Sequence, residues 1–321
     1  MTRFYAFNGD ADGLCAQQQL RLREGADGTL VTGTKRDIEL LQRVDAAAGD
    51  EVTALDISLD RNRAPLLRLL AIGVSVRYFD HHYAGELPAH PHFEPHIEES
   101  AEVCTSVLVA RYLGEPSNRW AIAAAFGDGL PVVATALARS AALDAATIAV
   151  LEELGTLLNY NAYGDSIRDL RVDPAELARE MLPFSDPVDF ARRSRAFVAL
   201  AEGYEDDMRK ARALRPVRQV PGATLLMLPD APWARRSIGV LANELVGAQS
   251  GNAIAILAPR TRGGYIVSVR VPPGRSTSAE EFCRGYKTGG GRKLAAGIDH
   301  LAQADLDGFM QCFETDFRVE R

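Results

Sequence analysis

Four apolar runs in this chain end at an acidic residue or at a short acidic and histidine cluster, and this pattern most constrains the fold. The residues that follow the runs are Asp10 with Asp12, then Asp56, then Asp80 with His81 and His82, and finally Asp128. The first three runs are typical of short buried strands and the fourth of a helix; they span residues 3–7, 52–55, 74–79 and 121–126. We therefore predict an open α/β sheet that collects these side chains in one crevice, because residues just beyond the carboxyl ends of parallel strands meet there.

Carboxylates gathered at one edge of a sheet repel one another unless a cation joins them. Oxygen and imidazole groups are ligands of divalent metal ions, so a metal site is the simplest arrangement. Asp10 and Asp12 stand two residues apart and would face the same way at a strand end, so each could hold one ion. That is the geometry of a two-metal centre with ions about 3.5–4 Å apart. In such a centre Asp56 would bridge the ions and His81 would supply the nitrogen ligand.

Other interpretations of these residues are weaker. Asp-x-Asp-Gly also begins a calcium-binding loop, but the further ligands and closing glutamate of such a loop do not follow. A His-His pair alone is more often a surface or hydrogen-bonded pair, but the recurrence of such residues at four element ends favours metal binding. His90, His92 and His96 lie in a segment rich in proline and glutamate at 83–101, which is typical of a solvated irregular loop rather than of a structural zinc site.

Four motifs of the chain resemble, in order and spacing, those of the DHH phosphoesterase superfamily. They are Asn8-Gly-Asp-Ala-Asp-Gly-Leu-Cys-Ala16, Leu55-Asp56-Ile57, Asp80-His81-His82 and Gly127-Asp128-Gly129. Near the other end, Gly289-Gly-Gly-Arg-Lys-Leu-Ala-Ala-Gly297 is similar to the glycine motif of the DHH-associated C-terminal domain, and Arg270 matches the substrate-facing arginine of that domain. The resemblance covers nearly the whole chain, and six motifs in register make it specific.

The resemblance implies an enzyme that hydrolyses phosphodiester or phosphoanhydride bonds with two Mn²⁺ ions, or with Mg²⁺ in their place. The implied ligands of one ion are Asp12, Asp56, His81 and Asp128, and those of the other are Asp10 and Asp56. His82 would contact a phosphate oxygen or the leaving oxygen. Asp80 would support the two histidines, because a histidine ligand generally donates its other N–H to an acceptor.

The resemblance also implies where the substrate binds. The helix expected after Cys104 begins at Thr105 and Ser106, whose N–H groups and hydroxyls are placed to contact phosphate. Gly289, Gly290 and Gly291 allow positive φ and close backbone approach, so their N–H groups can form an anion-binding nest that Arg292 would reinforce. Arg270 supplies donors suited to a terminal phosphate.

This two-domain form resembles enzymes that hydrolyse linear dinucleotides and very short oligoribonucleotides, such as pGpG and pApA, to mononucleotides. Two residues depart from the family pattern: Ala6 stands where related enzymes commonly place a metal-binding histidine, and Arg292 stands where the glycine motif usually ends in histidine. The departures predict weak binding of one ion and an altered phosphate or base contact. The alternatives are a phosphohydrolase of the same fold acting on nucleoside bisphosphate, single-stranded DNA ends or polyphosphate, and a noncatalytic nucleotide-binding protein.

Composition agrees with a soluble enzyme and a small anionic substrate. The 321 residues, 47% of them hydrophobic, are enough for two domains, and the net charge of −7 argues against a protein that coats long nucleic acid. The cysteines lack Cys-x-x-Cys spacing; they are Cys15, Cys104, Cys283 and Cys312. No signal-peptide core precedes Asp10, and the most apolar later stretch is interrupted, so we predict a cytoplasmic protein with no membrane partner. A homodimer is compatible with the sequence.

Strand-like and helix-like runs divide the chain into two α/β parts. Strands alternate with helical segments, at 14–22, 38–44 and 64–72, up to about residue 115, and the pattern is then almost entirely helical to about 213. Strands return after Val217, with a hairpin at 253–271 and a terminal helix whose apolar stripe, from Leu306 to Phe317, should pack in the core. We predict a parallel-sheet DHH domain with a helical second half at 1–188, a linker helix at 189–214 and a smaller α/β domain with a mixed sheet at 215–321.

Overall fold

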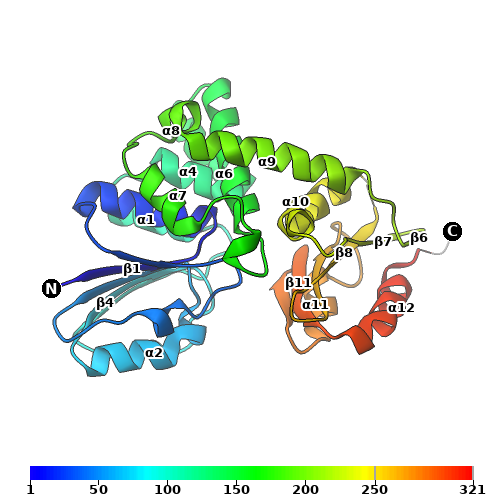
Figure 1. The fold of residues 1–321 in the computed structure, drawn as a ribbon, viewed down its shortest axis with the longest axis horizontal. Coiled ribbons are helices and arrows are strands. Elements are labelled where there is room, and N and C mark those ends of the chain that lie inside the picture. Colours follow the sequence, from blue (N-terminus) through cyan, green and yellow to red (C-terminus); the bar gives the residue numbers. More distant parts are fainter. Residues whose placement is uncertain (249–250, 320–321) are drawn as a thin grey trace. The chain divides into compact units, whose positions relative to one another are not determined.

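The computed structural model describes residues 1–248 and 251–319 (Figure 1). The chain forms two compact units, Met1–Glu202 and Gly203–Arg321. The boundary lies within helix α9 (Arg195–Arg212), inside the segment that the sequence predicts to join two domains. Across the described part of the chain, no helix combines the length and the apolar character that crossing a membrane requires.

A five-stranded sheet forms the centre of the first unit, and all its neighbouring strands run parallel, as predicted. The strands are β1 (Arg3–Phe7), β2 (Thr29–Thr32), β3 (Glu51–Leu55), β4 (Ser75–Asp80) and β5 (Phe93–Ile97), in the order β2-β1-β3-β4-β5. The order changes direction at β1, because β2 lies on one side of it and the later strands on the other. In open α/β sheets, ligands bind beyond the carboxyl ends of the strands at such a switch point.

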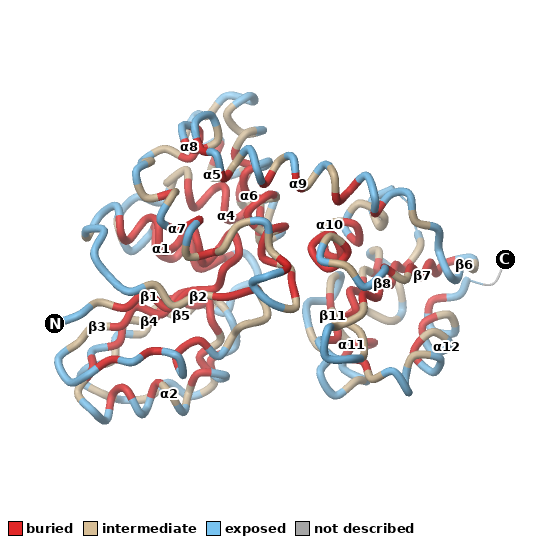
Figure 2. Tube along the Cα trace, viewed as in Figure 1, coloured by how far each residue is buried: buried red, intermediate tan, exposed pale blue. Residues whose placement is uncertain are grey.

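Alternating side chains of these strands pack against helices on both faces of the sheet. On one face Phe4, Val52 and Val76 form a core with helix α2 (Leu59–Ala71) and the 3₁₀ turn η1 (Leu40–Arg43). On the other face lies α1 (Ala11–Glu24), which contacts β1 and β3 and packs against α3 (Thr105–Tyr112). Figure 1 shows α1 and α2 on opposite sides of the sheet, and Figure 2 shows that the strands between them are largely buried.

The predicted helical second half is present. Its elements are α4 (Arg119–Gly127), α5 (Pro131–Ser140), α6 (Ala145–Ala162), the 3₁₀ turn η2 (Ile167–Asp169), α7 (Pro174–Met181) and α8 (Pro187–Arg193). Proline is the first residue of α5, α7 and α8. The N–H group at this position has no acceptor within the helix, so proline can lack it without losing a hydrogen bond.

The segment 189–214, expected as one helix, is divided at Ser194 between α8 and α9. Ser194 is extended, and its hydroxyl donates to Glu180 Oε1 at 2.6 Å and accepts from the N–H of Phe197 at 3.1 Å. Such a side-chain acceptor replaces the missing partner of a first-turn N–H group, so a new helix begins here.

Two edge strands were missed in the sequence. Strand β5 lies in the segment 83–101 that was expected to be irregular, and β2 forms the opposite edge of the sheet. None of their residues is fully buried, and β5 contains Pro95, which is tolerated at an edge because that strand has one partner only. The helix expected at 38–44 is reduced to the turn η1, in which Leu40 and Leu41 are buried.

The second unit contains the predicted mixed sheet. Its strands are β6 (Arg218–Val220), β7 (Ala223–Met227), β8 (Ala253–Pro259), β9 (Tyr265–Arg270), β10 (Gly289–Arg292) and β11 (Ala295–Leu301), in the order β10-β11-β9-β8-β7-β6. Only β7 and β8 pair in parallel among the described strands of this sheet, and β8 and β9 form the predicted hairpin. The helices are α10 (Pro232–Ala248), α11 (Ala279–Arg284) and α12 (Leu306–Phe317), with the 3₁₀ turn η3 (Gln303–Asp305) before α12. Phe309, Phe313 and Phe317 of α12 lie in the core, as the apolar stripe predicts.

Candidate metal centre

Asp10 lies directly beyond β1 and caps helix α1. Its Oδ1 accepts hydrogen bonds from the N–H groups of Asp12 at 3.1 Å and Gly13 at 3.2 Å, which otherwise have no partner in the first helical turn. Gly13 is required for this turn, because a Cβ there would lie 2.1 Å from the carbonyl oxygen of Asn8. The Asn-Gly-Asp-x-Asp-Gly motif is thus a tight connection that holds two carboxylates at the end of β1.

Asp12 lies in the first turn of α1 and is held by a second helix. Its Oδ2 accepts from the N–H of Thr105 and its Oδ1 from the N–H of Ser106, both at 2.7 Å. The hydroxyl of Thr105 donates to Asp56 Oδ1 at 3.3 Å, and that of Ser106 to the carbonyl of Asp12 at 2.9 Å. Both residues are fully buried, and the start of α3 positions the carboxylates; contact of these residues with phosphate stays a prediction.

Asp56 follows β3 and has an unusual backbone. Its φ is 56°, a left-handed conformation that aspartate tolerates better than most side chains, and its N–H donates to the carbonyl of Phe79 at 3.1 Å. Burial raises the pKa of the Asp56 carboxyl well above its usual range, and the neighbouring charges of Asp12, Asp10 and Asp128 raise it further. An acid that is destabilised in its charged form by other acids is one that a bound cation would stabilise.

His81 turns its second ring nitrogen toward these carboxylates. Its Nδ1 lies 2.9 Å from the carbonyl oxygen of Val103, which can only accept, so Nδ1 carries a proton. In the neutral ring, Nε2 is then an acceptor, and it lies 3.4 Å from Asp56 Oδ1 and 3.9 Å from Asp12 Oδ2. Two acceptors that face one another in a buried site need a shared proton or a cation between them, and imidazole with carboxylate is a ligand set for Mn²⁺ or Zn²⁺. The residues present therefore fit a divalent metal ion.

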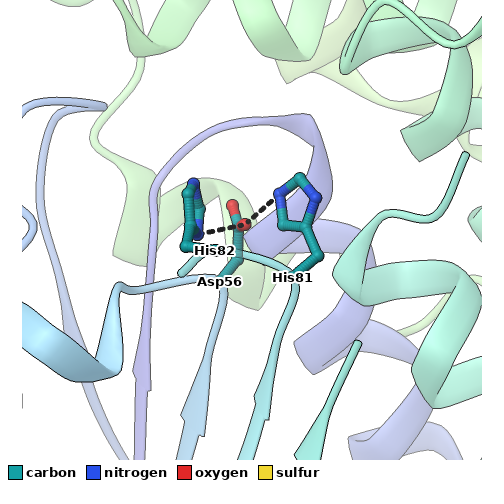
Figure 3. Close-up of side chains that lie close together, drawn as sticks. All are labelled: Asp56, His81 and His82. Carbon is teal, nitrogen blue, oxygen red and sulfur yellow. Dashed lines mark ion pairs between the residues drawn. The ribbon is translucent and has the colours of Figure 1, made fainter. Parts of the chain in front are cut away.

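His82 lies on the other side of Asp56 from His81 (Figure 3). Its Nδ1 lies 2.7 Å from Asp80 Oδ1, and Asp80, which is fully buried, also accepts from the N–H groups of His81 and Leu59. Burial opposes protonation of His82, but the hydrogen bond and charge of Asp80 prevail and raise its pKa. Its side chain is 45% exposed, so the ring presents its other edge to solvent or substrate.

The predicted residues meet at one edge, but not all at one point. Ligand atoms within 4.8 Å of one another come from Asp56, His81 and His82 among the described residues. Since the Nδ1 atoms of both histidines are already hydrogen bonded, an ion between these residues would take Asp56 Oδ1 and His81 Nε2, with Asp12 Oδ2 adjacent. Asp128 is half-buried at the end of α4. Burial raises the pKa of Asp12 and the charge of Asp128 raises it further, so Asp128 lies near the same centre.

Lys35 is a charged residue of the centre that sequence reasoning missed. It follows β2 as the aspartates follow β1 and β3, and its Nζ contacts Asp10 Oδ2 and lies 3.2 Å from Asn159 Oδ1. Lys35 and burial act in opposite directions on Asp10, and the net effect lowers the pKa of Asp10. The available signal was the position of Lys35 just beyond a strand, but β2 was not recognised.

The predicted substrate-binding residues of the second unit form one row on its sheet. Ala295 of β11 pairs with both Arg292 of β10 and Arg270 of β9, so the two arginines lie on the same face. Arg270 donates from Nε to Asn243 Oδ1 of α10 at 2.6 Å.

The three glycines lie in the edge strand β10. Gly291 has a positive φ. Close packing explains why the strand is glycine. A Cβ at Gly289 would lie 1.7 Å from the carbonyl oxygen of Cys283, and one at Gly291 would lie 2.5 Å from Ala296 Cα. An extended strand does not form the nest of N–H groups that was expected, because a nest requires alternating helical conformations.

Comparisons with solved structures identify the fold. No protein-family model and no curated protein matches the chain. The structure is similar to exonuclease RecJ bound to manganese, with a TM-score of 0.59, 19% identity and coverage of 98% of this chain and 89% of RecJ. It is also similar to RecJ of Thermus thermophilus in complex with Mn²⁺, with a TM-score of 0.62 and 21% identity, although the matched 98% of this chain spans only 51% of that protein.

A third similar structure is PggH of Vibrio cholerae, a pGpG-specific phosphodiesterase. The TM-score is 0.53, the identity is 14%, and 98% of each chain is covered. The chain therefore has the two-unit α/β fold of RecJ and PggH, which is the fold that the DHH resemblance predicts.

Proposed function

We propose that this chain is a Mn²⁺-dependent phosphohydrolase that converts linear dinucleotides and very short oligoribonucleotides, such as pGpG and pApA, to mononucleotides. One observation carries the proposal: His81 Nε2 and Asp56 Oδ1 face each other at 3.4 Å among buried carboxylates at the switch point of a parallel sheet. The similarity in fold to a pGpG-specific phosphodiesterase, over 98% of both chains, supports the choice of substrate.

The chain's own residues suit a phosphate ester. A divalent ion held by Asp56, His81 and Asp12 would lower the pKa of a coordinated water and neutralise charge on the phosphate. His82 lies beside that position, with its Nδ1 4.0 Å from Asp56 Oδ1, and its raised pKa favours the protonated ring. A protonated ring can donate to a phosphate oxygen or to the leaving oxygen. Asp80 orients this ring by holding its Nδ1–H.

Substrate capture is assigned to the second unit. We propose that Arg270 and Arg292, with the backbone of Gly289, Gly290 and Gly291, contact the substrate's terminal phosphate. Guanidinium groups bind phosphate through pairs of charge-assisted hydrogen bonds, and the two arginines share one sheet face.

A different phosphohydrolase activity is the second candidate. The structure is also similar to an exopolyphosphatase-related protein of Bacteroides fragilis, with a TM-score of 0.52 and 13% identity, and RecJ is an exonuclease. Nucleoside bisphosphate, single-stranded DNA ends and polyphosphate are therefore alternative substrates.

A substrate panel tests the proposal. The protein would be incubated with Mn²⁺ and with 5′-labelled di- to heptanucleotides, cyclic dinucleotides, nucleoside bisphosphates, single-stranded DNA and polyphosphate, and the products would be resolved by length. We expect the linear dinucleotides to be hydrolysed fastest and to yield mononucleotides. The matched control is Asp56→Asn, which removes the charge and tolerates the positive φ, and should lower turnover by about 100-fold or more. Preferred cleavage of polyphosphate or of longer DNA would support the second candidate, and binding without turnover would indicate a noncatalytic protein.

A further inference from the structure

The DHH resemblance implies two metal ions, but the structure holds a protein cation at one side of the centre. We propose that the ammonium group of Lys35 occupies one of the two cation positions, so that the centre binds a single divalent ion. The inference rests on the proposed metal-dependent function and concerns how many ions that function uses.

Lys35 is fixed in place by several elements of the first unit. Its N–H donates to the carbonyl of Ala162 at 2.9 Å, and its carbonyl accepts from Asn8 Nδ2 at 3.4 Å. Its Nζ contacts Asp10 Oδ2, lies 3.2 Å from Asn159 Oδ1 and is 5.9 Å from the ring centroid of Tyr163. With backbone and side chain both anchored, the ammonium is part of the centre and not a mobile surface group.

Asp10 has its charge compensated without a metal ion. Its Oδ1 accepts two N–H groups of α1, and its Oδ2 contacts the Lys35 ammonium. An ion bound at Oδ2 would have to approach the ammonium closely, and the like charges would repel each other beside a buried carboxylate, although the Lys35 side chain itself is 28% exposed. Asp10 was the ligand expected to distinguish the second ion, so this contact removes the main reason for that ion.

Asp56 and His81 are in the opposite condition. Their facing atoms are acceptors 3.4 Å apart, and within the described residues the group that brings metal-ligand atoms together includes both of them and not Asp10. Lys35 Nζ contacts Asp10 Oδ2, whereas no such contact of Lys35 with Asp56 is present among the described ion pairs. The centre thus divides into one part in direct contact with the lysine and one part, around Asp56 and His81, that Lys35 reaches only at longer range.

The absence of a histidine at Ala6 agrees with this division. Ala6 is a fully buried core residue of β1 that packs on the α2 face of the sheet, so it offers no ligand to the centre. Weak binding of one of the two ions was expected from the sequence on this ground. The contact between Lys35 and Asp10 goes further than the missing histidine does. The cation position beside Asp10 lacks one ligand, and in addition the Lys35 ammonium occupies it.

Mn²⁺ stoichiometry tests the proposal independently of activity. Equilibrium dialysis with metal analysis would give the number of ions per chain, and electron paramagnetic resonance would distinguish isolated Mn²⁺ from an exchange-coupled pair. We expect one isolated ion per chain in the wild type. Lys35→Met removes the charge but retains the length of the side chain, so it should bind a second ion about tenfold or more tightly than the wild type does and give the coupled spectrum.

Three further variants complete the test. Lys35→Arg keeps the cation and should still bind one ion, and Lys210→Met, a matched change at an exposed lysine of α9, should also bind one. Asp10→Asn should leave the wild-type stoichiometry at one, which provides a readout even if Lys35→Met does not fold.

Two coupled ions in the wild type would overturn the proposal while leaving metal-dependent hydrolysis intact. One ion in both the wild type and a folded Lys35→Met would remove lysine as the cause. No bound ion in the wild type would overturn the proposed function itself.

Discussion

The charged residues of the centre differ in how their charge is compensated. Asp12 is held by two N–H groups at the start of α3, Asp10 by α1 and Lys35, and Asp80 by His82. Asp56 accepts a long hydrogen bond from the Thr105 hydroxyl and faces His81 Nε2, and burial with the neighbouring acids raises its pKa well above the usual range. Asp56 is therefore the carboxylate that we propose as the main metal ligand, while the other acids are oriented by the protein.

The Asp80–His82 pair makes a prediction about pH. The pKa of His82 in the folded protein is raised above the ordinary value of about 6.5, so the pair stabilises the fold fully below that pH and the contribution is lost as the pH rises through the raised pKa. If protonated His82 takes part in turnover, kcat should fall as the pH rises through the same range. Asp80→Asn removes the charge that raises the pKa, so the fall in kcat should move to lower pH.

The measurement is kcat against pH for both proteins, together with the imidazole titration of His82 by NMR. His82→Gln is the reference variant. Its kcat should be about 100-fold or more lower, and its pH profile should lack the fall in kcat at high pH that depends on the His82 proton. An unchanged high-pH limb in a folded Asp80→Asn, alongside a shifted NMR titration, would show that His82 does not act as a proton donor.

At the scale of elements, two helices place Asp128. Helix α4 carries Asp128 at its end, and α4 touches α6 backbone to backbone where both have glycine. A Cβ at Gly155 of α6 would lie 2.1 Å from the carbonyl oxygen of Ala123, and one at Gly127 would lie 2.4 Å from Ala11 Cβ. These small residues let α4 approach α1, which bears Asp12, so the two acids meet because the helices pack without side chains between them.

Gly155→Ala should therefore separate the helices. We expect a loss of about 1–3 kcal/mol in unfolding free energy, as for other insertions into a packed core, and weaker Mn²⁺ binding because Asp128 moves with α4. Gly247→Ala is the matched control, since Gly247 lies in α10 with nothing within 4 Å of its added Cβ. That change should leave Mn²⁺ affinity unaltered and stabilise the helix by about 0.5–1 kcal/mol. Denaturant titration and metal binding measure both effects; equal stability changes in the two variants would contradict the packing argument.

At the scale of the whole molecule, chemistry and substrate capture are assigned to different units. Arg270→Ala or Arg292→Ala in the second unit should raise KM for a 5′-phosphorylated dinucleotide by about tenfold or more, corresponding to about 1.5–3 kcal/mol for a hydrogen bond to a charged group. The increase should be much smaller for the same dinucleotide without its 5′ phosphate. Arg262→Ala, at an exposed arginine in the β8–β9 turn, serves as the control and should change neither KM.

Steady-state kinetics with the two substrates measure the difference. Arg270 also bonds Asn243 within its own unit, so thermal unfolding of Arg270→Ala should accompany the kinetics. Equal losses for both substrates would mean that the arginines have a structural role and do not read the phosphate.

Much of the fold is determined by local sequence. Buried strands such as β1 and β3 are continuous apolar runs, and the acids that end them appear as abrupt changes of polarity, so Asp10, Asp12 and Asp56 were predictable from position alone. The Phe-rich stripe of α12 and the β8–β9 hairpin were predicted for the same reason, because periodicity and turn residues are local signals. The edge strands β2 and β5 lack that signal, since an edge strand is stabilised by one partner and tolerates polar residues and proline.

What only the tertiary structure decided is which groups meet across long separations in the chain. The sequence by itself determined the set of acids and histidines and the sheet edge at which they gather. It did not show that Lys35 reaches Asp10 from the end of β2, or that the N–H groups of Thr105 and Ser106 donate to Asp12. Nor did it show that the Gly289 segment, expected to form a nest, pairs with β11 as a strand. These outcomes depend on distances between elements, and the charge of a buried group is compensated by whichever partner packing brings within hydrogen-bond reach.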